Sequence, residues 1–274
     1  MDTIILKRIM TVMFSLLAAV LYSRNNDCKE MGLKGKVKSI SETQYKLNAI
    51  NPGVNEVLLT KFSFNRNCRK TEEVITDVEG EIKDKHIIVY DKSGNISSEN
   101  TETPTVKGYF TTKYRYDANR RLSKKEISSG GKILTTYIYS YDENGNVGKT
   151  EIRKKPGYDI HDEDFEYKYD GKNRLTEEIH HDGAKYNRIV YQYNDKDLII
   201  RRVEYNERGG ITYETDYTYD ELDNLSTEIS AYRGNTTFNY SYLYEYDEQG
   251  NWINKRSLLD DKTYMLQIRI ITYY

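Results

Sequence analysis

The sequence is poor in the aliphatic side chains that build an ordinary globular core. Hydrophobic residues make up 37% of the 274 residues, but this share includes 27 tyrosines, and charged residues make up 31%. The mean hydropathy is -0.82. Such polarity is typical of disordered chains, yet the aromatic content and the strict patterning described below argue against disorder. We therefore expect a thin, extended structure that uses tyrosine as its packing residue.

The sequence also lacks the motifs of common enzymes. It has no glycine-rich phosphate loop, no Gly-x-Ser-x-Gly elbow and no Cys/His pair with supporting spacing. The net charge is -2 with mixed signs, so no one-signed surface favours nucleic acid. We expect no enzymatic activity, no cofactor and no nucleic-acid partner.

Histidine is scarce, and its four positions do not build a metal site. They are His86, His161, His180 and His181. The segments His161-Asp162-Glu163-Asp164 and His180-His181-Asp182 hold ligand-type residues, but both lie at predicted turns, where such residues are normally solvated. Adjacent strand residues also point to opposite faces, which separates His180 from His181. We expect no metal.

A single long apolar run lies at the start of the chain. Lys7 and Arg8 precede an apolar run from Ile9 to Tyr22, and Ser23 follows it as a small residue at a cleavage point. This run is shorter than the roughly 20 residues that span a bilayer. Residues 1–23 therefore predict a cleaved signal peptide, followed by a linker over 24–34. Export to the periplasm, the cell surface or the medium is expected.

Only two cysteines are present, Cys28 and Cys68. Cys28 lies far from the apolar run, so a soluble exported protein is favoured over the alternative, a lipoprotein attached to the membrane. Export permits a disulfide, and a first hairpin that turns at Asn51-Pro52-Gly53 brings Cys28 near Cys68. The sequence leaves open whether these two cysteines form a disulfide or remain free thiols.

The rest of the chain is one motif repeated eight times. Tyr139-Ser140-Tyr141-Asp142 is a typical copy, with two aromatics in alternation followed by Asp or Asn. The eight turn-opening residues are Asn65, Asp91, Asp117, Asp142, Asp170, Asn194, Asp220 and Asp247, at intervals of 26, 26, 25, 28, 24, 26 and 27 residues. Such a period indicates a repeat array over residues 35–274.

Each copy contains a strand, a tight turn and a return strand. Alternation places both aromatics on one face. A type I turn with a bulge requires a left-handed residue three positions after the Asp or Asn. Gly145 suits that position, whereas Cys68 and Arg120 fit it poorly, so we expect those two turns to differ in type. With one further strand at each end, the pattern predicts 18 strands and almost no helix after the leader.

This arrangement predicts an all-β, antiparallel meander of two-strand repeats. Stability would be a sum of terms between neighbouring repeats. Because long sheets twist and curl, we expect a curled or spiral, open sheet with the tyrosines on its concave face. Its open edge strands would permit dimerisation.

The motif Tyr-x-Tyr-Asp-x-x-Gly-Asn-apolar, as in residues 139–147 and 244–252, resembles the YD repeat of the RHS family. The resemblance covers residues 35–274. It implies a bacterial surface or secreted protein with a spiral β-sheet, which in large members closes into a shell around a toxin domain. Here the repeats run to Tyr274 and no Asp-Pro-x-Gly cleavage motif is present, so the chain looks like a short stand-alone exported member of Bacteroidota type.

We expect the functional surface to lie where a copy has more tyrosines than the packing of the sheet requires. Aromatic rings with polar tips suit sugars or peptide segments, so the candidate ligand surface is Tyr137, Tyr139, Tyr213, Tyr242, Tyr244 and Trp252. We expect a non-enzymatic binding or scaffold module at the cell envelope, with a carbohydrate or protein partner. The alternatives are a component of an RHS-type toxin-delivery or contact system and, less favoured, a glycan-active enzyme.

Overall fold

The computed structural model describes residues 27–47, 53–104, 108–154, 162–183, 185–234 and 236–274, so the predicted signal peptide and His161 lie outside the described residues. Within these ranges, no helix is both long and apolar enough to cross a membrane. The described chain forms one short helix, α3 (Asp27–Glu30), and a series of strands. The strands are β1 (Val37–Leu47), β2 (Val54–Phe64), β3 (Lys70–Thr76), β4 (Ile82–Tyr90), β5 (Ile96–Thr103), β6 (Gly108–Tyr116), β7 (Leu122–Ser129), β8 (Lys132–Tyr141), β9 (Val147–Lys154), β10 (Glu163–Tyr169), β11 (Leu175–Asp182), β12 (Lys185–Tyr193), β13 (Ile199–Tyr205), β14 (Ile211–Tyr219), β15 (Leu225–Tyr232), β16 (Thr236–Tyr246), β17 (Trp252–Leu259) and β18 (Lys262–Tyr273).

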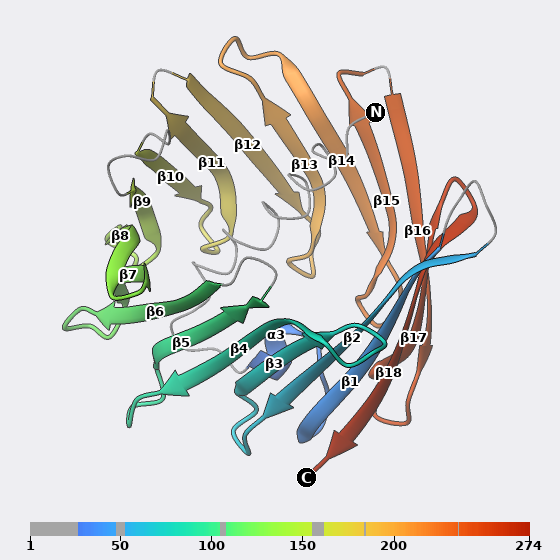
Figure 1. Cartoon of the computed structure of the whole chain (residues 1–274). Helices are drawn as coiled ribbons and strands as arrows, with labels where there is room; N and C mark the ends of the chain where they lie inside the picture. Colours follow the sequence, from blue (N-terminus) through green and yellow to red (C-terminus); the bar gives the residue numbers. More distant parts are fainter. Residues whose placement is uncertain (1–26, 48–52, 105–107, 155–161, 184, 235) are drawn as a thin grey trace.

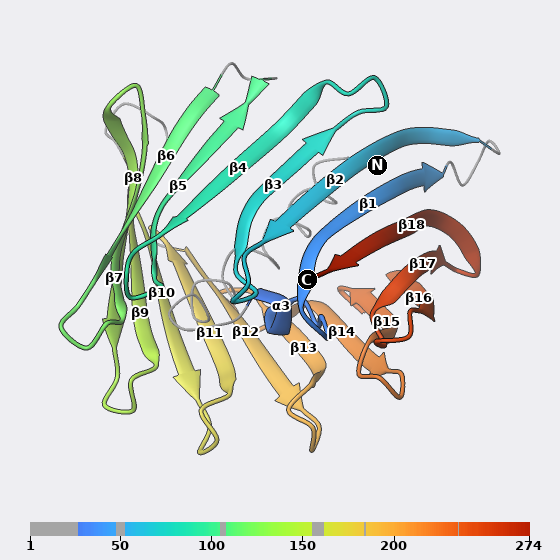
Figure 2. The same cartoon turned by 90° about the horizontal axis from the view of Figure 1, so that it is seen from below.

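The strands form a closed antiparallel barrel, and the prediction of an open sheet is wrong. Each strand pairs with its neighbours in the sequence, and β1 also pairs with β18, from Val37 opposite Tyr273 to Lys46 opposite Met265. Figures 1 and 2 show the resulting ring. The sheet therefore curls as expected, but its two edge strands meet. The edge strands β1 and β18, which were expected to permit dimerisation, are hydrogen-bonded to each other within one chain.

The eight turns opened by Asp or Asn, here called the motif turns, share one geometry. In each turn, the residue three positions after the opening Asp or Asn donates its N–H to the carbonyl of that opening residue, as from Gly145 to Asp142 at 3.1 Å. That third residue has positive φ in every copy: Cys68, Gly94, Arg120, Gly145, Asn173, Asp197, Asp223 and Gly250. The expectation that Cys68 and Arg120 occupy other turn types is wrong. Their φ angles are 58° and 62°, so the shared hydrogen bonds impose the left-handed conformation despite the side chain.

The tyrosines of the repeated motif face the inside of the barrel. Helix α3 lies inside the ring (Figures 1 and 2), and its Cys28 packs with Ile40 and Phe64 in one buried cluster. Phe64 is the second aromatic of the first copy, so the motif aromatics define the inner wall. The outer wall carries ion pairs across strands, such as Arg201 with Asp216 at 2.8 Å. A sheet with a packed inner face and a charged outer face is the usual arrangement for an antiparallel sheet in water.

The second tyrosine of most copies is bonded to the preceding repeat. Its hydroxyl donates to the backbone carbonyl of the residue that begins the previous return strand, for example from Tyr141 to Leu122 at 2.8 Å. The donors in this series are Tyr90, Tyr116, Tyr141, Tyr169, Tyr193 and Tyr219. Buried phenol groups need such partners, and here each partner is the first residue of the adjacent strand, which belongs to the preceding copy. The series therefore ties every repeat to its neighbour through side chains as well as through the ladder.

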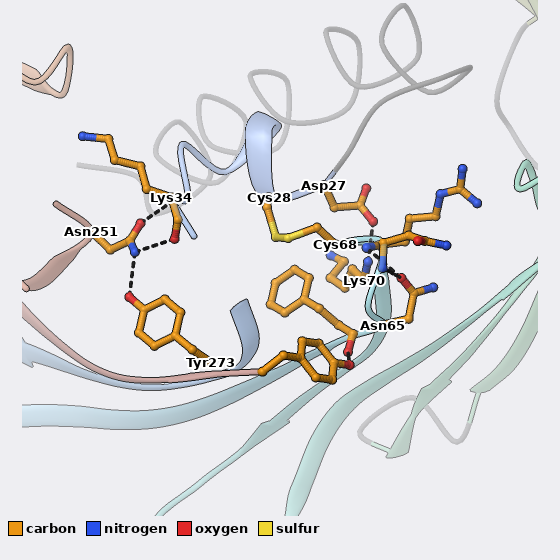
Figure 3. The surroundings of a disulfide bond; sticks show 12 residues. Asp27, Cys28, Lys34, Asn65, Cys68, Lys70, Asn251 and Tyr273 are labelled. Carbon is orange, nitrogen blue, oxygen red and sulfur yellow. Dashed lines mark hydrogen bonds between the residues drawn. A yellow bond between two sulfur atoms is a disulfide. The ribbon is translucent and has the colours of Figure 1, made fainter. Parts of the chain in front are cut away.

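The seam between β1 and β18 is covered on the inside by residues 27–36, here called the strap. At one end a disulfide joins Cys28 to Cys68, with Cα atoms 5.5 Å apart, and the Asp27 carboxylate accepts a hydrogen bond from the Lys70 N–H. At the other end Lys34 exchanges two hydrogen bonds with the Asn251 side chain, 2.7 and 2.9 Å long (Figure 3). The strap thus connects the first motif turn to the last, across both seam strands.

The strap also supplies apolar contacts to the seam. Leu33 and Cys28 pack in the same buried cluster as Val37 and Ile40, which are completely buried. Residues 27–34, which the sequence suggests as linker, therefore contribute to the core. A cavity of about 250 Å³ lies beside the disulfide and is lined in part by Lys36 and Arg66.

Two glycines at the same turn position provide a matched test of motif-turn packing. Gly94 and Gly145 both have φ of 84°. A Cβ at Gly94 would lie 2.0 Å from Nη1 of Arg69, whereas a Cβ at Gly145 meets no atom within 4 Å. Both Gly→Ala variants should lose about 1 kcal/mol of unfolding free energy because alanine disfavours this conformation.

Gly94→Ala should lose about 0.5–1 kcal/mol more, since the Arg69 guanidinium must leave its place over the Tyr90 ring, 5.5 Å from the centroid. Urea denaturation of both variants measures the difference. Equal losses would show that the Arg69 contact contributes nothing to stability.

A second test concerns the strap. The Cys28→Ser/Cys68→Ser variant should lose about 2–4 kcal/mol of stability, because the disulfide closes a long loop of chain. Hydrogen exchange should accelerate mainly in residues 27–36, β1 and β18, where the strap packs, and much less in β10–β14. Uniform acceleration through all strands would contradict the local role assigned to the strap.

Candidate binding surface on the inner wall

The inner wall carries a belt of ionisable side chains that runs between the tyrosines. The belt residue lies eight positions after each turn-opening Asp or Asn, near the middle of the return strand. The belt consists of Glu73, Glu99, Lys125, Thr150, Glu178, Arg202, Glu228 and Lys255. Seven of these eight residues are ionisable. The sequence analysis missed this pattern, although the repeat alignment itself contains the signal.

Each belt residue lies directly opposite the first aromatic, or its aliphatic substitute, of its own copy. Examples are Tyr114 opposite Lys125, Tyr191 opposite Arg202 and Tyr217 opposite Glu228. Directly opposed residues of an antiparallel pair have Cβ atoms about 4.5–5.5 Å apart. Six of the seven belt charges therefore lie opposite an aromatic residue of their own copy, and Glu99 lies opposite Ile88.

Burial changes the protonation of several belt residues. Glu178 is 3% exposed and makes no hydrogen bond or ion pair with any described residue. Burial raises the pKa of Glu178 to about 7, against the opposing charge of Arg202. The Arg202 guanidinium is instead bonded to Glu204 on its own strand. Glu178 is thus a buried carboxyl that is partly protonated near neutral pH.

His86 lies on the inner wall near the first repeats, between two carboxylates. Its Nδ1 lies 2.8 Å from Glu99 Oε1 and its Nε2 lies 2.9 Å from Asp84 Oδ2. The hydrogen bond with Glu99 raises the pKa of His86 to about 9, with further support from Asp84 and against the effect of burial. Burial opposes ionisation of Glu99, but its bond with His86 lowers the Glu99 pKa overall. These groups form a charged cluster.

The six aromatics of the predicted ligand surface all lie on the inner wall, in separate places. Tyr137 and Tyr139 are on β8, Tyr213 is on β14, and Tyr242 and Tyr244 are on β16 beside Trp252 on β17. The structure therefore does not bring them together into one continuous surface.

Several of these rings are already covered by cations of the wall. Lys125 lies 4.2 Å from the Tyr137 centroid, and Arg269 lies 3.3 Å from the Trp252 centroid. Lys255 lies over Tyr242 at 4.7 Å. Cation–π contact is therefore a recurring interaction of this wall.

The remaining histidines take ordinary positions on opposite faces. His180 points inward, stacks on Phe165 with centroids 4.2 Å apart and bonds to Glu163 at 2.8 Å. His181 lies nearest to Glu166, with its Nε2 3.6 Å from a carboxylate oxygen. Over the described ranges, no group of three or more His, Cys, Asp or Glu residues is arranged to hold a metal ion.

The charge state of His86 gives a pH-dependent prediction. Its folded pKa exceeds the unfolded value of about 6.5, so its stabilising effect is complete below that pH and is lost as pH rises through about 9. His86→Gln should therefore cost about 2 kcal/mol near pH 6 and much less near pH 10. Urea denaturation at the two pH values measures this, with His181→Gln as control. A penalty that stays constant with pH would contradict the assignment.

Comparison with known proteins does not establish a family. No protein-family model matches the sequence, and no curated protein does. A porin-like protein from Bacteroides uniformis is similar in structure, with a TM-score of 0.47 and 11% identity over 87% of this chain and 99% of that one. The TcdB2–TccC3–Cdc42 and TcdB2–TccC3 complexes match with TM-scores of 0.32 and 0.31 and identities of 15% and 14%, over 81% of this chain but only 15% and 16% of theirs. Scores and identities this low assign neither family nor function.

Proposed function

We propose that this protein is a non-enzymatic exported binding module of the bacterial cell envelope whose ligand, a carbohydrate or a segment of a partner protein, contacts the inner wall. The observation that carries the proposal is the combination of tyrosine rings and belt charges on that wall. A closed barrel of this many strands is wider than its own side chains fill. Half-buried rings such as Tyr137 and Tyr213 therefore remain within reach of a ligand.

We further propose that the repeats are of the YD type. Support comes from the shared motif-turn geometry in all eight copies and from the tyrosine hydroxyls that bond each copy to the one before. The disulfide between Cys28 and Cys68 supports export, because disulfides persist mainly in oxidising compartments. The predicted signal peptide is consistent with the same destination.

The test is a glycan array and a peptide pull-down with the full chain, each hit being confirmed by direct titration. Tyr137→Ala, which removes a half-buried inner ring, should weaken binding about five- to tenfold. Tyr186→Ala, which removes a tyrosine that is 42% exposed on the outer wall, should leave affinity unchanged. Two blank screens, or equal losses in the two variants, would overturn the proposal.

A further inference from the structure

One belt residue, Glu228 on β15, is surrounded by tyrosines from three other strands. It lies opposite Tyr217 on β14 and opposite Tyr240 on β16. The hydroxyl of Tyr242 donates to its carboxylate at 3.3 Å, and so does the hydroxyl of Ser230, also at 3.3 Å. Glu228 is thus held by two neutral donors at the centre of an aromatic group.

Four rings form this group, here called the tyrosine cage: Tyr213, Tyr240, Tyr242 and Tyr264. The rings of Tyr240 and Tyr264 meet edge to face with centroids 6.0 Å apart. The charge of Glu228 contributes to raising the hydroxyl pKa of all four, after burial, which places the carboxyl within electrostatic reach of each.

The strands between the rings carry small residues. Ser230 on β15 and Ser257 on β17 are 0% and 1% exposed, so they lie beneath the level of the aromatic side chains. The four tyrosines and Glu228 are themselves only half-buried. The cage is therefore an aromatic, carboxylate-bearing group on the inner wall whose side chains are partly exposed.

The carboxylate of the cage has no ion-pair partner. Among the described residues Glu228 makes no ion pair; burial raises its pKa, against the charges of Arg202 and Lys255. Neither of these cations is bonded to Glu228, since Arg202 is bonded to Glu204 and Lys255 lies over the ring of Tyr242 in the cage and over that of Tyr244. In the part of the chain that the structure describes, no cation lies over Tyr213, Tyr240 or Tyr264.

Another part of the inner wall also has a cation beside tyrosine rings and a carboxylate. Lys125 lies 4.2 Å from the Tyr137 centroid; burial lowers its pKa, and the charge of Glu99 opposes that shift. A cation over aromatic faces is attracted to them, most strongly when it is desolvated. The cage around Glu228 repeats the rings and the carboxylate, but its lysine, Lys255, lies over Tyr242 alone among the four cage rings.

We propose that the tyrosine cage binds an alkylammonium group. The rings offer their faces to the cation, and Glu228 neutralises its charge. This inference rests on the proposed function, because it names a chemical group that the inner wall recognises.

The experiment is a calorimetric titration of the full chain with choline and with 3,3-dimethylbutan-1-ol, its neutral isostere, in which carbon replaces the charged nitrogen. Choline should bind at one site and the alcohol at least about tenfold more weakly. Equal binding of the two, or no binding of choline, would overturn the proposal. A parallel titration with n-butylammonium separates primary from quaternary ammonium as the preferred form.

Variants of the cage locate the site. Glu228→Gln keeps the size of the side chain and should reduce choline affinity about tenfold, and Tyr240→Leu should reduce it about three- to thirtyfold. Glu245→Gln, on the exposed face of β16, is the matched control and should bind as the wild type does. Unchanged far-UV circular dichroism excludes misfolding of the variants. Wild-type affinity in Glu228→Gln would overturn the proposal.

The outcome is distinguishable from that of the proposed function. The choline titration does not depend on finding the physiological ligand, and Tyr137 lies on β8, outside the cage. Loss of the cage would leave glycan or peptide binding that depends on Tyr137 intact. Blank glycan and peptide screens would leave a positive choline titration standing.

Discussion

An open β-sheet exposes a row of backbone N–H and C=O groups on each edge strand, and these groups need partners. In this chain the two edges satisfy each other, because β1 and β18 pair along almost the whole of β1. The closure depends on side chains of the inner wall as well. Glu42 and Arg269, each 10% exposed at the side chain, form an ion pair across the seam at 2.8 Å. The strap adds a second connection between the ends of the sheet, from Cys68 to Asn251, and packs on Val37 and Ile40 of β1. Inner and outer walls become distinct only because the ring is closed.

The tyrosine hydroxyls adapt the repeat to this closure. Through the middle of the barrel each second tyrosine donates to a backbone carbonyl of the preceding copy. Toward the C-terminal strands the partner changes, and Tyr246 and Tyr273 bond instead to the turn-opening Asp220 and Asp247. The first copy has Phe64, which carries no hydroxyl and packs in the buried cluster with Cys28. Departures from the repeat therefore concentrate near the seam, on β2, β16 and β18.

Local features were predictable from the sequence, whereas closure was not. The alternation of aromatics and the Asp or Asn before each turn have physical effects within four or five residues, so strands, turns and the inward tyrosine face follow from them. Pairing between Ile40 and Ile271 leaves no local trace, since both residues look like ordinary strand positions. The turn type at Cys68 and Arg120 does not follow from the low preference of these residues for positive φ, because the hydrogen bonds shared by the motif turns impose that conformation. The repeat alignment contains the belt positions, but only the structure shows that they share the inner wall.

The belt also explains why function should lie on the inner wall rather than in the turns. Burying a charge is costly unless a partner compensates it. Four carboxylates and three cations alternate with rings around the belt, and most find partners, as Glu99 does with His86. Around Arg202 on β13 the charges are not balanced, because its single guanidinium is bonded to Glu204 while Glu178 and Glu228 lie two strands away on either side, on β11 and β15. Glu178 responds by holding its proton near neutral pH. Glu228 is less buried and lies among tyrosine rings, so it is the carboxylate for which we propose an external cation as the partner.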